Sequence, residues 1–283
     1  MTAQNYIVVG TDGSTHAANA VTWAANEAQR VGRPLRIVSV FEQWAEMRPG
    51  IESVHTAQEQ HAQGLLEQAR DTVRARFPDL EVQTVLRSGH PVEQLGQMSA
   101  DAELLVTGTR GRGGFTGMLL GSTSHSLTLR SVAPLVVVPG SLPPPAGPVV
   151  VGVDGSEEAG RALDFAAAQA RSRKAPLIAV QVVAEPPWFG PAEVYGAWVE
   201  DILALTREAL DEDLAPIRQE YPELKIQART PRGHPAEELR RIADSAQLLV
   251  VGSRGRSMTR SVLLGSTSHG VLHHAPCPVA VLK

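Results

Sequence analysis

Apolar and polar positions follow the same order twice along the chain. Short apolar runs alternate with longer, helix-forming stretches, a pattern typical of strands that alternate with helices in a mostly parallel sheet. In the first half, strands are predicted at Tyr6–Gly10, Leu35–Val40, Glu81–Leu86, Glu103–Thr107 and Leu135–Val138. Helices are predicted at about Thr15–Val31, at about Thr56–Phe77, from Pro91 onward and at about Leu119–Ser131. The second half repeats this order up to a last strand at Val279–Leu282.

Local signals agree with these boundaries. Ser14 is suited to cap the first helix and Gly32 to end it. Gly89 permits a tight turn, and Pro91 suits the first position of a helix. The strand at Glu103–Thr107 is nearly all apolar, as expected for a strand that helices cover on both faces. We therefore expect an α/β protein of two tandem Rossmann-like domains, each an open, parallel five-stranded sheet flanked by helices.

The two halves also share short sequence motifs, which indicates a duplicated domain. Each motif recurs at a nearly constant offset: Val8–Ser14 at Val150–Ser156, Gly89–Leu95 at Gly233–Leu239, and Leu104–Arg112 at Leu248–Arg256. A proline-rich segment lies between the copies and is suited to a fairly stiff linker. The predicted domains are residues 1–140 and 149–283, with a linker at 141–148.

Composition narrows the class of protein. The net charge of −4 argues against a nucleic-acid binder, which usually presents a basic face. The single cysteine, Cys277, excludes an intramolecular disulfide. No apolar run approaches the roughly 18 residues that span a membrane, and no signal peptide is recognisable. We expect a soluble cytoplasmic protein with neither nucleic acid nor membrane as a partner.

Glycines and hydroxyl side chains gather at the carboxyl ends of two predicted strands, where open parallel sheets bind ligands. Backbone amides in such loops form a concave nest for anions, and a helix start adds free N–H groups. We expect the glycines to let the backbone meet a ligand closely, so that a Cβ at Gly108 or Gly252 intrudes on it. The spacing, two residues and then nine between glycines, is the same in both halves: Gly108, Gly111, Gly121, Ser122 and Thr123, then Gly252, Gly255, Gly265, Ser266 and Thr267.

Two other phosphate motifs are absent from the sequence. A P-loop needs a lysine directly after its glycine, and none of Lys174, Lys225 and Lys283 is so placed. No G-x-G-x-x-G follows the first strand of either half, so the dinucleotide fingerprint is also missing.

The aspartates and arginines beside these loops each have two possible roles. Asp12 and Asp154 either cap the next helix through an Asx-turn or bind a nucleotide, directly or through Mg²⁺. The loop arginines either offset the charge of a phosphate or simply face solvent; they are Arg110, Arg112, Arg254 and Arg256. His125 and His269 are the repeated histidines near the loops, and neither is assigned a catalytic role.

This combination resembles the ATP-binding branch of the universal stress protein family, whose signature is G-2x-G-9x-G-S/T with an aspartate just after the first strand. The resemblance covers nearly the whole chain. As two tandem domains, the chain is similar to the tandem members of the family from mycobacteria and related actinobacteria. It implies one ATP in each half, with adenine near the aspartate and the end of the second strand and phosphates on the glycine-rich loop. The implied residues are Gly10, Asp12, Val40, Gly108, Thr109, Arg110, Gly111, Arg112, Gly113, Gly114, Gly121, Ser122 and Thr123, then Gly152, Asp154, Val182, Gly252, Ser253, Arg254, Gly255, Arg256, Ser257, Met258, Gly265, Ser266 and Thr267.

The copies differ inside the nine-residue spacer. Gly114 corresponds to Met258, which adds bulk and removes conformational freedom, so we expect the first site to bind ATP more tightly.

The function expected is that of an ATP-binding regulatory protein in stress response or growth control, with an unknown protein partner. A slow ATPase or nucleotidyl-transfer enzyme and a scaffold without nucleotide are the alternatives. The last strand of each half is apolar and lies at a sheet edge, so we expect the halves to pair there and the chain to form a homodimer.

Overall fold

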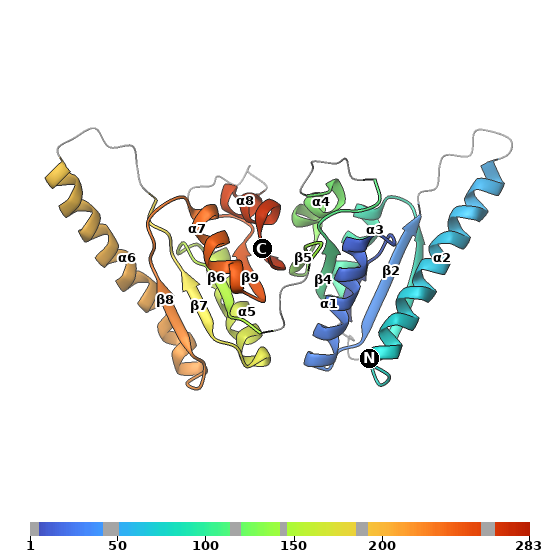
Figure 1. The fold of residues 1–283 in the computed structure, drawn as a ribbon, viewed down its shortest axis with the longest axis horizontal. Coiled ribbons are helices and arrows are strands. Elements are labelled where there is room, and N and C mark those ends of the chain that lie inside the picture. The colour runs from blue at the N-terminus through green and yellow to red at the C-terminus, as the bar shows by residue number, and fades with distance from the viewer. Residues whose placement is uncertain (1–5, 42–50, 114–119, 142–145, 185–191, 256–263) are drawn as a thin grey trace. The chain divides into compact units, whose positions relative to one another are not determined.

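A computed structural model describes residues 6–41, 51–113, 120–141, 146–184, 192–255 and 264–283. The chain divides into two compact units, Met1–Leu142 and Pro143–Lys283. Each unit is described by itself below, and Figure 1 shows its strands and helices. None of the helices in the described ranges is both long and apolar enough to cross a membrane.

The first unit alternates strands and helices from end to end. Its elements are β1 (Tyr6–Gly10), α1 (Thr15–Val31), β2 (Leu35–Phe41), α2 (Ile51–Arg76), β3 (Val82–Ser88), α3 (Pro91–Met98), β4 (Ala102–Gly108), α4 (Ser122–Arg130) and β5 (Leu135–Val138). The second unit repeats the order with β6 (Val149–Gly152), α5 (Glu157–Arg173), β7 (Leu177–Val180), α6 (Ala192–Glu220), β8 (Ile226–Arg229), α7 (Pro235–Ile242), β9 (Leu248–Gly252), α8 (Ser266–His274) and β10 (Val279–Leu282).

Within the first unit all strand pairs are parallel, in the order β3-β2-β1-β4-β5. The second unit has the matching order β8-β7-β6-β9-β10, again parallel. α1 contacts α2 and α3 contacts α4, so right-handed crossovers place the two pairs on opposite faces of the sheet. The predicted α/β class, with helices around an open parallel sheet in each half, is confirmed.

Small alanine side chains line the buried faces of α1 and α5, which pack against the sheet of their unit. Ala20, Ala24 and Ala28 of α1 are fully buried at helical spacing, as are Ala162, Ala166 and Ala170 of α5. Every residue of β5 is buried as well, as expected for a strand covered on both faces.

The predicted helix ends are correct for α1. The Ser14 hydroxyl accepts a hydrogen bond from the Ala17 N–H, and Gly32 ends the helix in the left-handed conformation at φ 66°. In the second unit Lys174 takes the place of that glycine, at φ 52°.

Two predicted helix starts were wrong. α2 begins at Ile51 rather than about Thr56. α4 begins at Ser122 rather than about Leu119, because Gly121 is extended and its N–H donates to the Thr109 carbonyl at 2.7 Å. The predicted linker falls partly on residues 142–145, which lie outside the described residues.

Candidate functional site

In the first unit a cavity of about 740 Å³ lies at the carboxyl ends of β1 and β4. The strand order reverses between these two strands, which is where open parallel sheets bind ligands. The cavity volume is within the usual range for small-molecule sites, roughly 300–1,000 Å³. The predicted residues that line it are Gly10, Asp12, Val40, Gly108, Arg110, Gly111, Arg112, Gly113, Gly121, Ser122 and Thr123.

Asp12 joins the two loops of the cavity. Its Oδ1 accepts a hydrogen bond from the Ser14 N–H at 3.0 Å, which is the Asx-turn. Its Oδ2 accepts from the Arg112 N–H of the glycine-rich loop at 2.7 Å. A Cβ at Gly111 would lie only 2.5 Å from Oδ2, so a glycine there leaves room for the carboxylate. Asp12 therefore forms the Asx-turn just before α1 and also occupies an amide of the glycine-rich loop.

The start of α4 forms another part of the cavity wall. Ser122 and Thr123 are its first two residues, and both line the cavity. The free N–H groups of this first turn and the helix dipole favour an anion. The Ser124 hydroxyl donates to the Gly108 carbonyl at 2.6 Å and ties the helix start to the end of β4.

Gly108 lines the cavity and also lies against the first helix of its unit. A Cβ at this position would lie 2.7 Å from the backbone carbonyl carbon of His16 in α1. At Gly252 a Cβ would lie 3.0 Å from the Cβ of Glu158 in α5. Both glycines therefore make room for the first helix of their unit, and the expectation that they also let a ligand approach stays a prediction.

Thr109 is the one described site residue of the first half that is not among those lining the cavity. Its N–H donates to the Val138 carbonyl at 2.9 Å, and its hydroxyl pairs with His16 Nδ1 at 2.7 Å. It fastens the loop to β5 and α1.

Helix α2 supplies a wall that sequence reasoning missed. Gln58, His61 and Leu65 all line the cavity. Leu65 lies over the β1–α1 loop, where a Cβ at Gly13 (φ 78°) would come within 2.5 Å of it. His61 Nε2 also contacts the Arg112 guanidinium. Nothing in the local pattern of α2 reveals which of its faces meets the site.

Three polar atoms of cavity-lining residues are buried and have no hydrogen-bond partner among the described residues. They are Thr107 Oγ1, Gln58 Oε1 and Arg110 Nε. A buried polar group without a partner costs about 1–3 kcal/mol, so such atoms in a cavity wall favour a polar ligand. Thr107 was detectable in sequence, as the polar residue that ends an apolar strand.

The charge of His16 matters for the first unit because Arg110 and Asp12 lie near it. Burial lowers the pKa of His16, the Arg110 guanidinium lowers it further, and Asp12 opposes both. The imidazole is therefore neutral at neutral pH and adds no charge beside Arg110.

The second unit repeats much of this geometry. Asp154 Oδ1 accepts from the Ser156 N–H at 3.1 Å and from the Ser156 hydroxyl at 2.6 Å. Its Oδ2 lies against the position that a Cβ of Gly255 would take. The Gly265 N–H donates to the Ser253 carbonyl at 2.8 Å, as Gly121 does to Thr109.

The other predicted site residues in the described part of the second unit lie at the ends of strands and at the start of α8. Gly152 ends β6, where a Cβ would lie 2.9 Å from the Leu239 side chain. Val182 follows the end of β7, and Ser266 and Thr267 open α8. Gly114, Arg256, Ser257 and Met258 lie outside the described residues, so the predicted effect of the spacer stays a prediction.

Both units match one family when the chain is compared with known proteins. The sequence profile of the universal stress protein family matches residues 5–139 and 146–283. A universal stress protein of Mycolicibacterium smegmatis is 35% identical over 290 residues, which cover 98% of this chain and 96% of that protein. One from Mycobacterium tuberculosis is 34% identical over 295 residues, with 99% and 97% covered. The crystal structure of a universal stress protein from Archaeoglobus fulgidus has a TM-score of 0.72 at 21% identity, and covers 99% of this chain and 96% of that one.

Proposed function

The chain belongs to the universal stress protein family, and from this premise we propose that it binds ATP in each unit and acts through the bound state as a regulator of stress response or growth. The observation that carries the proposal is the cavity of the first unit. Two loops of the predicted signature, the start of α4 and three unpartnered polar atoms meet there.

The phosphates would lie on the glycine-rich loop and the start of α4. Backbone amides, the hydroxyls of Ser122 and Thr123 and the Arg110 guanidinium are the donors on offer. Charge-assisted hydrogen bonds of this kind contribute about 1.5–3 kcal/mol each, so a few of them support roughly micromolar affinity after the entropy of binding. The adenine would lie towards Val40, at the end of β2.

Asp12 has a second part in this proposal. Its carboxylate holds the Arg112 N–H at 2.7 Å, so an incoming phosphate competes for that amide. Mg²⁺ would relieve the repulsion, held by Asp12 together with phosphate oxygens and water, which are the hard oxygen ligands that it prefers. Within the described part of the chain, no three His, Cys, Asp or Glu side chains gather closely enough to hold a metal ion by themselves.

Mass spectrometry of the ligand released when purified protein is denatured tests the proposal. ATP or ADP near two equivalents per chain supports it. Protein that releases no nucleotide and binds none in calorimetry, with or without Mg²⁺, contradicts it. Sedimentation at several concentrations tests the homodimer, and fractionation of cells tests the cytoplasmic location that we also propose.

A slow ATPase is the second candidate, because Asp12 and His61 both face the cavity. Both side chains contact Arg112 of the glycine-rich loop. This arrangement suits ligand binding better than catalysis. We therefore expect turnover well below the typical enzyme value of about 10 s⁻¹. Turnover in that range, lost in Asp12→Asn, would favour the enzyme.

A further inference from the structure

The two sites differ at one position of their first helices. His16 of α1 and Glu158 of α5 each follow the capping serine by two residues. They also match in space, because each lies against the glycine that ends β4 or β9. A neutral imidazole in one unit thus takes the place of a carboxylate in the other.

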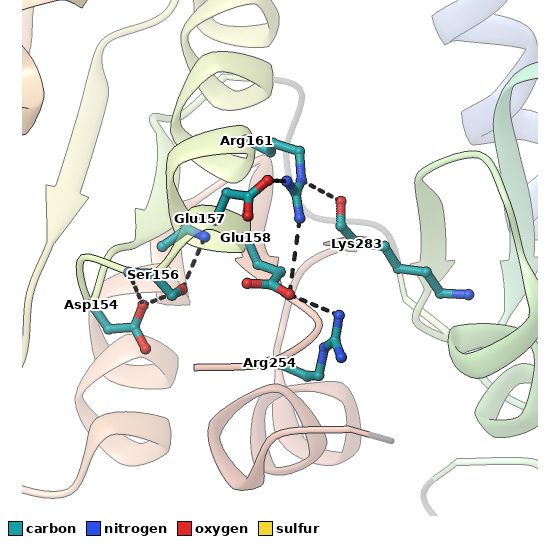
Figure 2. Close-up of polar contacts among 8 residues, drawn as sticks. Asp154, Ser156, Glu157, Glu158, Arg161, Arg254 and Lys283 are labelled. Carbon is teal, nitrogen blue, oxygen red and sulfur yellow. Dashed lines mark hydrogen bonds and ion pairs between the residues drawn. The ribbon is translucent and has the colours of Figure 1, made fainter. Parts of the chain in front are cut away.

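In the second unit this carboxylate engages the loop arginine. Glu158 Oε1 lies 2.9 Å from Arg254 Nη2 and 3.9 Å from Arg161 Nη2. Figure 2 shows Arg254 reaching from its loop to Glu158, with Arg161 on the other side of the same carboxylate. The Glu158 side chain is 17% exposed and that of Arg254 is 37% exposed, so solvent screens the pair only in part. Breaking it would leave a largely buried charge without its nearest partner.

In the first unit the equivalent arginine has a different neighbour. Arg110 lines the cavity, and its Nε is buried without a hydrogen-bond partner among the described residues. His16 pairs with the Thr109 hydroxyl and brings no negative charge. The positive charge of Arg110 is therefore available to an anionic ligand in a way that the charge of Arg254 is not.

We propose that Glu158 neutralises Arg254 and so leaves the second unit with little preference for triphosphates over nucleotides with fewer phosphates. The inference rests on the proposed nucleotide binding. A triphosphate carries the most negative charge and gains most from a guanidinium, so it loses most when Glu158 holds Arg254. The first unit keeps the preference for triphosphate.

Calorimetry of the full-length chain with ATP, ADP and AMP tests this, using wild type, Glu158→Gln and Glu157→Gln. Glu157→Gln is the matched control, since it removes one charge from the same helix turn but leaves the pair with Arg254. Its side chain is 84% exposed and contacts Arg161. In wild type we expect one site to prefer ATP over AMP strongly and the other to discriminate little.

Glu158→Gln should tighten ATP binding at the less selective site about tenfold, equivalent to about 1.4 kcal/mol, and change AMP affinity less than about twofold. Glu157→Gln should leave both affinities within about twofold of wild type. The reciprocal change His16→Glu should weaken ATP binding at the selective site about tenfold. It tests the same inference if Glu158→Gln does not fold.

Two sites that bind ATP with the same preference in wild type would overturn the inference and leave the proposed function standing. So would an ATP affinity that Glu158→Gln, or His16→Glu in its place, leaves unchanged. Absence of nucleotide binding at both sites would instead overturn the proposed function itself.

Discussion

Replacing Thr107 by valine should make the first unit more stable and its ligand affinity weaker. Thr107 is 5% exposed at the end of β4, lines the cavity, and its Oγ1 has no hydrogen-bond partner among the described residues. The second unit carries Val251 at the matching position, 3% exposed, so the fold accepts this side chain there.

The magnitude follows from two terms of the same sign. An unpaired buried hydroxyl costs about 1–3 kcal/mol, and the methyl that replaces it gains up to about 0.8 kcal/mol from burial. Allowing for partial relaxation, we expect about 1–2 kcal/mol of stabilisation. For a unit of this size that raises its melting temperature by about 3–8 °C. If the hydroxyl binds the nucleotide, its loss weakens binding by about 0.5–1.5 kcal/mol, roughly 2–10-fold.

Thermal unfolding without nucleotide and calorimetry with ATP measure the two effects, and Val251→Thr is the control. That change buries a new hydroxyl and should destabilise the second unit by about 1–3 kcal/mol. A lower melting temperature in Thr107→Val would refute the reasoning, because it would mean that the hydroxyl is already satisfied in the free protein. Unchanged ATP affinity would remove Thr107 from the ligand contacts.

Three further predictions concern single positions. Lys174→Gly should raise the stability of the second unit by about 1 kcal/mol in chemical denaturation, because Lys174 holds a left-handed conformation at φ 52°; a loss of stability would show that its side chain matters more. Gly108→Ala should cost about 1–3 kcal/mol of stability through overpacking against α1, whereas Gly113→Ala, whose Cβ meets nothing within 4 Å, should cost less than about 0.5 kcal/mol. Burial raises the pKa of the Cys277 thiol to about 12, so a thiol reagent at neutral pH should react only after unfolding. The stability that this shift contributes is present below the ordinary pKa of 9.0 and is lost as the pH rises towards 12, a slope that Cys277→Ala should remove.

The sequence by itself determined the order of the elements and the position of the loops. The strands at Tyr6–Gly10 and Leu135–Val138 and the helix at Thr15–Val31 have the predicted bounds. Each depends on neighbouring residues: an apolar run for a strand, a capping serine and a terminal glycine for a helix. The internal repeat then placed the same loops in both halves, and the family resemblance is confirmed along nearly the whole chain.

The tertiary structure decided which of those residues meet. Arg112, whose N–H donates a hydrogen bond to Asp12, lies 100 positions further along the chain. The wall formed by α2 comes from a helix whose sequence does not show which face is buried. The same holds for Gly108, whose neighbour is a helix backbone, and for Glu158, which a sequence reading leaves as an ordinary residue of the first helical turn. A local pattern specifies backbone conformation because its interactions span a few residues, whereas these contacts depend on the reversal of strand order that brings distant loops to one edge of the sheet.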